Sequence, residues 1–276
     1  MLQPSATRLP VAIAFAAAAS IAQAQAPAAV TPAPEHTVTA NVGIFSEYIF
    51  RGIAQTAGEP ALQGGFDYAH SSGFYLGTWA SNVSWLQDFG AYNRSSVEWD
   101  FYGGFKAPIG STDFFYDVGL LYYYYPGKRN PGVVNVDTTE LYAALGWKWV
   151  SVKFSYSLDD YFGARPNAEQ KKTDGTYYVD LTATYPVADT GIALVGHVGY
   201  LDVKDDGSDG DLTTAGKVSY TDWKVGFSYT VPEGPVKGLE LGAYYTDNDA
   251  KKRFYTDLTG YDTTKARGVV YIKKTF

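Results

Sequence analysis

Several features are absent from this sequence, and each absence excludes a class of protein. There is no cysteine, so disulfide bonds and thiolate chemistry are excluded. Beyond the N-terminal segment, no apolar run reaches the roughly eighteen residues of a membrane-spanning helix. Basic residues are fewer than acidic ones, 22 against 29, and this net charge of −7 argues against a nucleic acid as partner.

The N-terminal segment has the pattern of an export signal. Arg8 provides a positive start, residues 11–22 are almost all apolar, and Ala22-Gln23-Ala24 fits a cleavage site. A short membrane anchor is the alternative, but about a dozen apolar residues are too few to span a bilayer. We therefore predict a cleaved signal peptide over residues 1–24, a flexible Pro- and Ala-rich leader over 25–37, and one domain over 38–276.

Aromatic residues and glycine are abundant in that domain, with 24 tyrosines and 29 glycines in the whole chain. They recur in runs where apolar and polar residues alternate, which is typical of strands with one apolar face. In the first run, Val42 and Ile44 fall on one side and Glu47 and Arg51 on the other. This run predicts a single strand of about fifteen residues, long enough to cross a bilayer.

Eleven further runs follow, and the connections between them are alternately long and short. Long external loops and tight periplasmic turns produce this rhythm in outer-membrane barrels. We therefore predict an all-β protein, a closed antiparallel transmembrane β-barrel with twelve strands in up-and-down order and six external loops. The predicted strands are 38–51, 62–68, 74–83, 97–106, 114–125, 137–149, 150–158, 177–185, 192–201, 222–231, 239–246 and 267–276.

Four blocks of this sequence resemble the TorF-like family of porins. They are Tyr48-x-Phe50-Arg51-Gly52-Ile53-x-Gln55-Thr56, Pro60-Ala61-Leu62-Gln63-Gly64-Gly65-x-Asp67-Tyr68, Gly73-Phe74-Tyr75-x-Gly77-x-Trp79-x-Ser81-Asn82 and Glu98-x-Asp100-x-Tyr102-x-Gly104. Beyond about residue 105 only the strand pattern is similar. The resemblance implies a barrel in the outer membrane of a Gram-negative bacterium that serves passive solute transport.

The last residue of the chain, Phe276, follows an alternating strand. A terminal Phe in that setting resembles the signal that the outer-membrane assembly machinery reads, although Lys274 stands where such signals often carry an apolar residue. Besides the lipid bilayer, we therefore expect this machinery as a partner.

The polar face of the strands is expected to line the interior of the barrel. Acids slightly outnumber bases there, which predicts a narrow channel for small hydrophilic solutes or ions with a mild cation preference. A salt-bridged interior that braces the barrel is the alternative. The predicted lining consists of Glu47, Arg51, Asp67, Glu98, Asp100, Lys106, Asp117, Glu140, Lys148, Lys153, Asp180, Asp222 and Lys224, with Glu240, Arg267 and Lys273 in the same phase.

Within this set, Arg51 is expected to pair with Asp67, Glu98 or Asp100 on neighbouring strands. Glu47 is excluded as its partner because four residues along a strand span roughly 13 Å. The resulting cluster would form a constriction or a structural clamp near the external end.

Other functions remain open at this stage. A non-conducting structural or receptor barrel would bind a partner through its external loops, and a soluble β-sandwich or lipocalin-like binder would have to bury the apolar faces. The acidic stretch around Asp205 and Asp209 offers oxygen ligands for calcium but lacks the full calcium-loop pattern. His197 lies mid-strand on the inner side, out of phase for a barrel phospholipase. We predict no catalytic residue, metal or cofactor; oligomeric state is left open.

Overall fold

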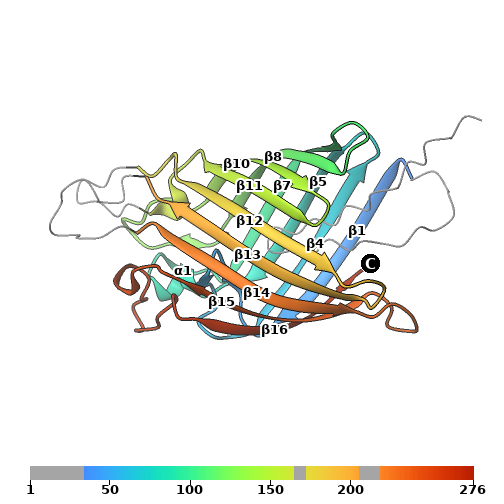
Figure 1. The fold of residues 1–276 in the computed structure, drawn as a ribbon. Helices are drawn as coiled ribbons and strands as arrows, with labels where there is room; N and C mark the ends of the chain where they lie inside the picture. The colour runs from blue at the N-terminus through green and yellow to red at the C-terminus, as the bar shows by residue number, and fades with distance from the viewer. Residues whose placement is uncertain (1–33, 165–171, 205–217) are drawn as a thin grey trace, which may run out of the picture.

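The computed structural model describes residues 34–164, 172–204 and 218–276. Twelve strands close into one antiparallel barrel, with each strand beside its neighbours in the chain and β1 closing on β16 (Figure 1). This confirms the predicted fold class. The barrel strands are β1 (His36–Phe45), β4 (Ala61–His70), β5 (Phe74–Asn82), β7 (Val97–Pro108), β8 (Phe114–Tyr124), β10 (Thr138–Trp147), β11 (Val150–Ser157), β12 (Tyr177–Pro186), β13 (Ile192–Asp202), β14 (Tyr220–Thr230), β15 (Leu239–Asn248) and β16 (Arg267–Thr275).

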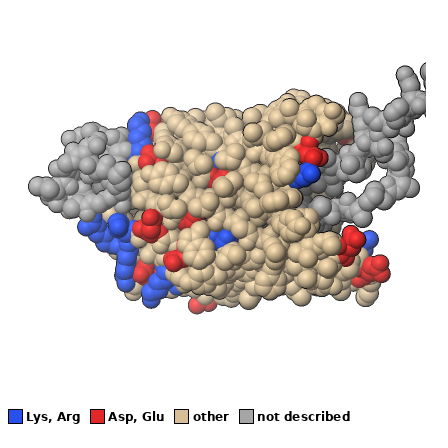
Figure 2. All heavy atoms as spheres, in the orientation of Figure 1, with Lys and Arg blue, Asp and Glu red and all other residues tan. Residues whose placement is uncertain are grey.

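The outer surface of the barrel is apolar. Because successive side chains point to opposite faces of a strand, the alternating sequence places every second residue outside. Large apolar side chains such as Leu62 and Phe66 are exposed, at 60% and 62%. Figure 2 shows the result on one face: charged atoms are most numerous toward the two ends, and the surface between them is mainly uncharged. This belt matches the hydrocarbon layer of a bilayer.

The two ends of the barrel differ. At one end the connections are short: 71–73, 109–113, 148–149, 187–191 and 231–238. At the other end they are long: 46–60, 83–96, 125–137, 158–176, 203–219 and 249–266. The C-terminus lies at the short-turn end (Figure 1), which by the rule for such barrels faces the periplasm. None of the helices in the described residues is long and apolar enough to cross a membrane.

The first strand is shorter than predicted. β1 begins at His36, inside the expected leader, and ends at Phe45. Residues 46–60, here named the inner loop, then leave the wall and form a small hairpin of β2 (Ile49–Phe50) and β3 (Ile53–Ala54). The backbone turns at Arg51 and Gly52, with φ of 47° and 76°. A side chain at Gly52 would meet Asp222, so only glycine allows this approach.

The external end is filled by packed loops. They carry α1 (Trp85–Asp88), the pair β6 (Tyr92–Arg94) and β9 (Lys128–Arg129), η1 (Tyr161–Gly163) and η2 (Lys252–Phe254). Tyr48 of the inner loop and Leu86 of α1 belong to one buried cluster with strand residues such as Trp79 and Tyr123. The predicted signal peptide and the acidic stretch around Asp205 lie outside the described residues.

Candidate functional site

The charged residues of the polar faces meet inside the barrel. The inner loop contributes Glu47 and Arg51, and the strands contribute all but one of the other predicted lining residues. Those on strands are Asp67, Glu98, Asp100, Lys106, Asp117, Glu140, Lys153, Asp180, Asp222, Lys224, Glu240, Arg267 and Lys273. The period of two thus placed most of these residues on strands, and their role as the lining of a channel stays a prediction.

Lys148 is the exception, and its predicted place in the lining is wrong. It lies in the two-residue turn between β10 and β11, with φ of 50°. Its side chain is 49% exposed and its Nζ lies 3.3 Å from Asp113 Oδ2. The sequence predicted a reversal between Trp149 and Val150, but the alternation continues through Trp147 and Trp149 and so placed Lys148 on the strand instead of in the turn.

Arg51 crosses the interior to the far wall. Its two terminal nitrogens donate to both carboxylate oxygens of Glu140, at 2.9 and 2.8 Å, and both side chains are at most 7% exposed. Nη1 also donates to the Tyr161 hydroxyl, and the guanidinium carbon lies 4.4 Å from the centre of the Tyr178 ring. The bidentate geometry makes this the strongest kind of ion pair. The predicted partners Asp67, Glu98 and Asp100 are wrong, because Arg51 lies on the inner loop rather than on a strand.

The inner loop is also fixed to three other strands. Tyr48 donates to Glu98 on β7 at 2.7 Å. The Arg51 carbonyl accepts a hydrogen bond from Tyr220 on β14 at 2.9 Å, and the Gly52 carbonyl accepts one from Asn248 on β15 at 2.8 Å. Together with the pair to Glu140 on β10, these contacts join the inner loop to four strands spread around the barrel. The inner loop therefore narrows the barrel at its external end.

Two acidic residues on β7 face this constriction. Glu98 accepts hydrogen bonds from Tyr48 and Tyr125, at 2.7 and 2.6 Å. Burial and the nearby Glu98 charge raise the pKa of Tyr48 well above its usual range, so Tyr48 stays protonated and able to donate. Asp100 is fully buried, yet neither of its carboxylate oxygens has a hydrogen-bond partner among the described residues. Such a carboxylate needs water, a cation or a solute donor to satisfy it.

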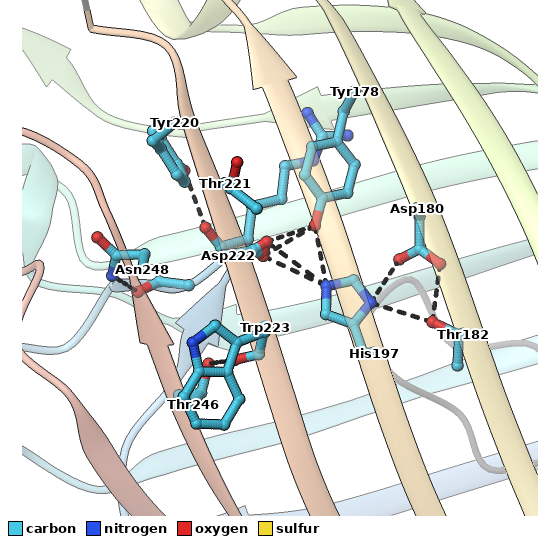
Figure 3. Close-up of polar contacts among 12 residues, drawn as sticks. Tyr178, Asp180, Thr182, His197, Tyr220, Thr221, Asp222, Trp223, Thr246 and Asn248 are labelled. Carbon is cyan, nitrogen blue, oxygen red and sulfur yellow. Dashed lines mark hydrogen bonds and ion pairs between the residues drawn. The ribbon is translucent and has the colours of Figure 1, made fainter.

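His197 lies deeper in the barrel, between two aspartates on the neighbouring strands (Figure 3). Its Nδ1 lies 3.1 Å from Asp180 Oδ2 and its Nε2 lies 3.3 Å from Asp222 Oδ1. Tyr178 donates to Asp222 at 2.7 Å, while its ring lies beneath the Arg51 guanidinium. These contacts link the middle of the interior to the inner loop.

Three lysines lie against aromatic rings of the interior. The Nζ atoms of Lys106, Lys153 and Lys224 lie 4.4, 4.3 and 5.3 Å from the ring centres of Phe115, Tyr142 and Tyr244. Among the described residues, no carboxylate oxygen lies within 4.0 Å of the Nζ of Lys153 or Lys224. The ammonium groups of Lys153 and Lys224 are therefore held by rings rather than by ion pairs among the described residues, a weaker restraint that leaves them able to contact a solute.

A second group of contacts holds the inner loop to the last external loop. Glu47 pairs with Arg267 at 3.2 Å and accepts hydrogen bonds from the Tyr261 hydroxyl and the Gly58 amide. Burial, followed by the hydrogen bond to Glu47, raises the pKa of Tyr261 to about 12. Glu47 and Arg51 thus have separate partners, as expected from their spacing.

Interior tyrosines are hydrogen-bond partners of the acids, a pairing that the sequence did not indicate. Tyr75 donates to Asp117 at 2.6 Å, Tyr102 donates to Asp67, and Tyr271 donates to Glu240 at 2.7 Å. Only their inward position was indicated, since these tyrosines share the phase of the predicted acids. Most interior carboxylates therefore have a tyrosine or a cation as partner, and Asp100 differs from them in having neither.

Among solved structures, the barrel is similar to several porins. The NanC porin has a TM-score of 0.51 at 10% identity, and the match covers 87% of this chain and 98% of that one. The KdgM porin has a TM-score of 0.49 at 9% identity, covering 86% of this chain and 99% of that one. OprD of Pseudomonas aeruginosa has a TM-score of 0.39 at 13% identity, covering 89% and 68%. At these identities the likeness to NanC shows a shared fold.

The sequence comparisons place the chain in a family. No curated protein matches it. One family model, described as "Bacterial protein of unknown function (Gcw_chp)", matches residues 29–276 and so covers the whole barrel. The fold and its apolar outer belt are those of a protein of the bacterial outer membrane. The chain is a member of the Gcw_chp family of bacterial proteins.

Proposed function

We propose that this barrel is a narrow porin-like channel through which small hydrophilic solutes or ions diffuse passively, as the resemblance to TorF-like porins implies. The observation that carries the proposal is the charged interior enclosed by an apolar wall. Burying charged side chains away from water costs free energy. A barrel with no channel would therefore be more stable with apolar residues in its interior. Lys153 and Lys224 lack ion-pair partners within 4.0 Å among the described residues. The carboxylate of Asp100 is fully buried and has no hydrogen-bond partner among them.

The proposed channel prefers cations. The interior acids outnumber the bases, and the excess grows when Lys148 is removed from the lining. Asp100 supports this preference most directly, because its two carboxylate oxygens face the constriction without a donor among the described residues. A cation that passes the inner loop would offer the charge that this carboxylate lacks.

Reversal potentials across a salt gradient test this preference. The mature barrel, inserted into a planar bilayer, should pass potassium in preference to chloride, and Asp100→Asn should shift the reversal potential toward zero. Asp113→Asn is the control, since Asp113 is 61% exposed and pairs with Lys148 at the opposite end. Equal shifts in the two variants, or none in Asp100→Asn, would contradict the proposed role of Asp100.

A non-conducting barrel that binds a partner through its external loops is the second candidate. The observation in its favour is the packed external end, where the Arg51–Glu140 pair holds the inner loop across the interior. Catalysis is not part of either proposal. Among the described residues, the polar contacts of His197 are with Asp180, Asp222, Tyr178 and Thr182.

We also propose that Phe276 is the signal for the outer-membrane assembly machinery. Its amide donates to the Ala40 carbonyl at 2.8 Å, so it extends the seam at which β16 closes on β1. The side chain of Phe276 is 71% exposed, so the assembly machinery could contact it.

A further inference from the structure

The periplasmic rim carries a group of side chains that the channel does not use. Glu35 and His36 stand at the start of β1, and His70 is the last residue of β4. His36 and His70 are direct partners in the antiparallel register, and their ring centres are 5.2 Å apart. One ligand atom from each of the three residues lies within 4.8 Å of the others. We propose that this group binds a divalent transition-metal cation such as zinc.

The donor set fits such a cation. Imidazole nitrogens favour zinc, copper and nickel over magnesium or calcium, and a carboxylate completes a set of three protein ligands. Ligands around a tetrahedral zinc ion stand roughly 3.4 Å apart, from bonds of about 2.1 Å. The carboxylate of Glu35 is 72% exposed and its Oε1 already lies 3.5 Å from His70 Nε2. A small rotation of this free side chain would close the set, with a fourth position left to water.

Both imidazoles have partners that leave one nitrogen for a metal. The Nδ1 atom of His36 lies 2.8 Å from the Tyr68 hydroxyl, and that of His70 lies 2.6 Å from the Ser72 hydroxyl. Without metal, His70 Nδ1 also accepts a hydrogen bond from the Ser72 amide. Metal at Nε2 would move the proton to Nδ1, which then donates to the Ser72 hydroxyl. Carboxylates, backbone carbonyls or water orient metal-binding histidines in other proteins, and the hydroxyls of Tyr68 and Ser72 would have that part here.

The site would fasten two parts of the rim. The Ser71 amide donates to the Glu35 carbonyl at 2.9 Å, so the backbone already holds the start of β1 against the turn after β4. A bound cation would add a cross-link between the first strand and this turn. The rim lies at the opposite end from the inner loop. The proposed metal site therefore does not depend on the proposed channel.

Zinc titration of the mature chain in detergent tests the inference. The chain must carry no polyhistidine tag, which would itself bind zinc. We expect one zinc ion per chain at neutral pH. His70→Asn and His36→Asn should each weaken binding at least tenfold, since loss of an outer-shell partner alone costs roughly 10- to 100-fold.

Asp113→Asn is the matched control, because it removes an exposed carboxylate of the same rim outside the cluster and should leave zinc affinity unchanged. Circular dichroism verifies that each variant keeps the barrel, and the two histidine variants serve as independent tests should one fail to fold. Absence of binding to the wild-type chain overturns the inference. Binding that both histidine variants retain would also overturn it.

Discussion

At the scale of single residues, the interior is organised by pairs between side chains far apart in sequence. Arg51 and Glu140 are 89 positions apart, and Tyr261 and Glu47 are 214 apart. Alternation places a side chain on the inner face, but it carries no information about which of the other strands supplies the partner. This is why the sequence predicted Glu140 as a lining residue and still assigned Arg51 the wrong acid.

Tyr261 offers a test of these pairs. Its hydroxyl has a pKa of about 12 in the folded chain, above its ordinary value near 10, because it is buried and donates to Glu47. Since the folded pKa is raised, the contribution of this hydroxyl to stability is fully present below about pH 10 and is lost as the pH rises toward 12.

The measurement is the tyrosinate absorbance of the wild-type chain minus that of Tyr261→Phe. We expect this difference to report one group with a midpoint near pH 12. Glu47→Gln, measured in the same way, should bring the midpoint closer to 10. A wild-type midpoint near 10 would show that the contact between the inner loop and the last external loop is absent.

At the scale of strands, the outer and inner faces obey different rules. The outer face contacts lipid. A charged residue there should therefore destabilise the barrel strongly near the middle of the belt and only slightly at its edges. Leu141 on β10 faces outward at 49% exposure, and Val38 faces outward near the periplasmic rim. Leu141→Arg should lower the free energy of unfolding by about 2 to 4 kcal/mol, and Val38→Arg by about 0 to 1 kcal/mol.

Urea unfolding of the barrel in lipid vesicles measures both values. Equal costs at the two positions would mean that this surface does not face a bilayer with its centre near the middle of the strands.

The inner face contains glycines that make room for aromatic rings on the next strand. Gly242 on β15 pairs with Tyr271 on β16, and a Cβ added to Gly242 would overlap the Tyr271 ring. Gly268 lies on the same pair of strands, and an added Cβ there would meet nothing within 4 Å. Gly242→Val should therefore lower the unfolding free energy by about 1 to 3 kcal/mol through overpacking, with little change for Gly268→Val.

Urea midpoints of the two variants decide this prediction. Loss of stability in Gly268→Val but not in Gly242→Val would contradict the packing of Tyr271 over the glycine.

At the scale of the whole molecule, the sequence predicted the barrel well but did not predict the loop that folds into its interior. Strand number, closure and the position of long and short connections follow from local rules of alternation and turn chemistry, which act within a few residues. The inner loop did not follow from them. Its sequence continues the alternation of β1 as far as Phe50, and only contacts with β7, β10, β14 and β15 explain why it turns inward.

If the barrel conducts as proposed, the inner loop sets the width of its pore. Breaking a buried ion pair by removing one partner costs about 3 to 5 kcal/mol. Glu140→Gln leaves the Arg51 guanidinium without its carboxylate and should loosen the inner loop from the wall. Asp113→Asn, which breaks an exposed pair worth about 0 to 1 kcal/mol, is the matched control.

Single-channel recording of the mature barrel in a planar bilayer tests this claim most directly. We predict discrete openings of low conductance for the wild-type chain and for Asp113→Asn, and larger openings for Glu140→Gln. A membrane-inserted barrel that stays silent in all three forms would contradict the claim and favour the receptor role.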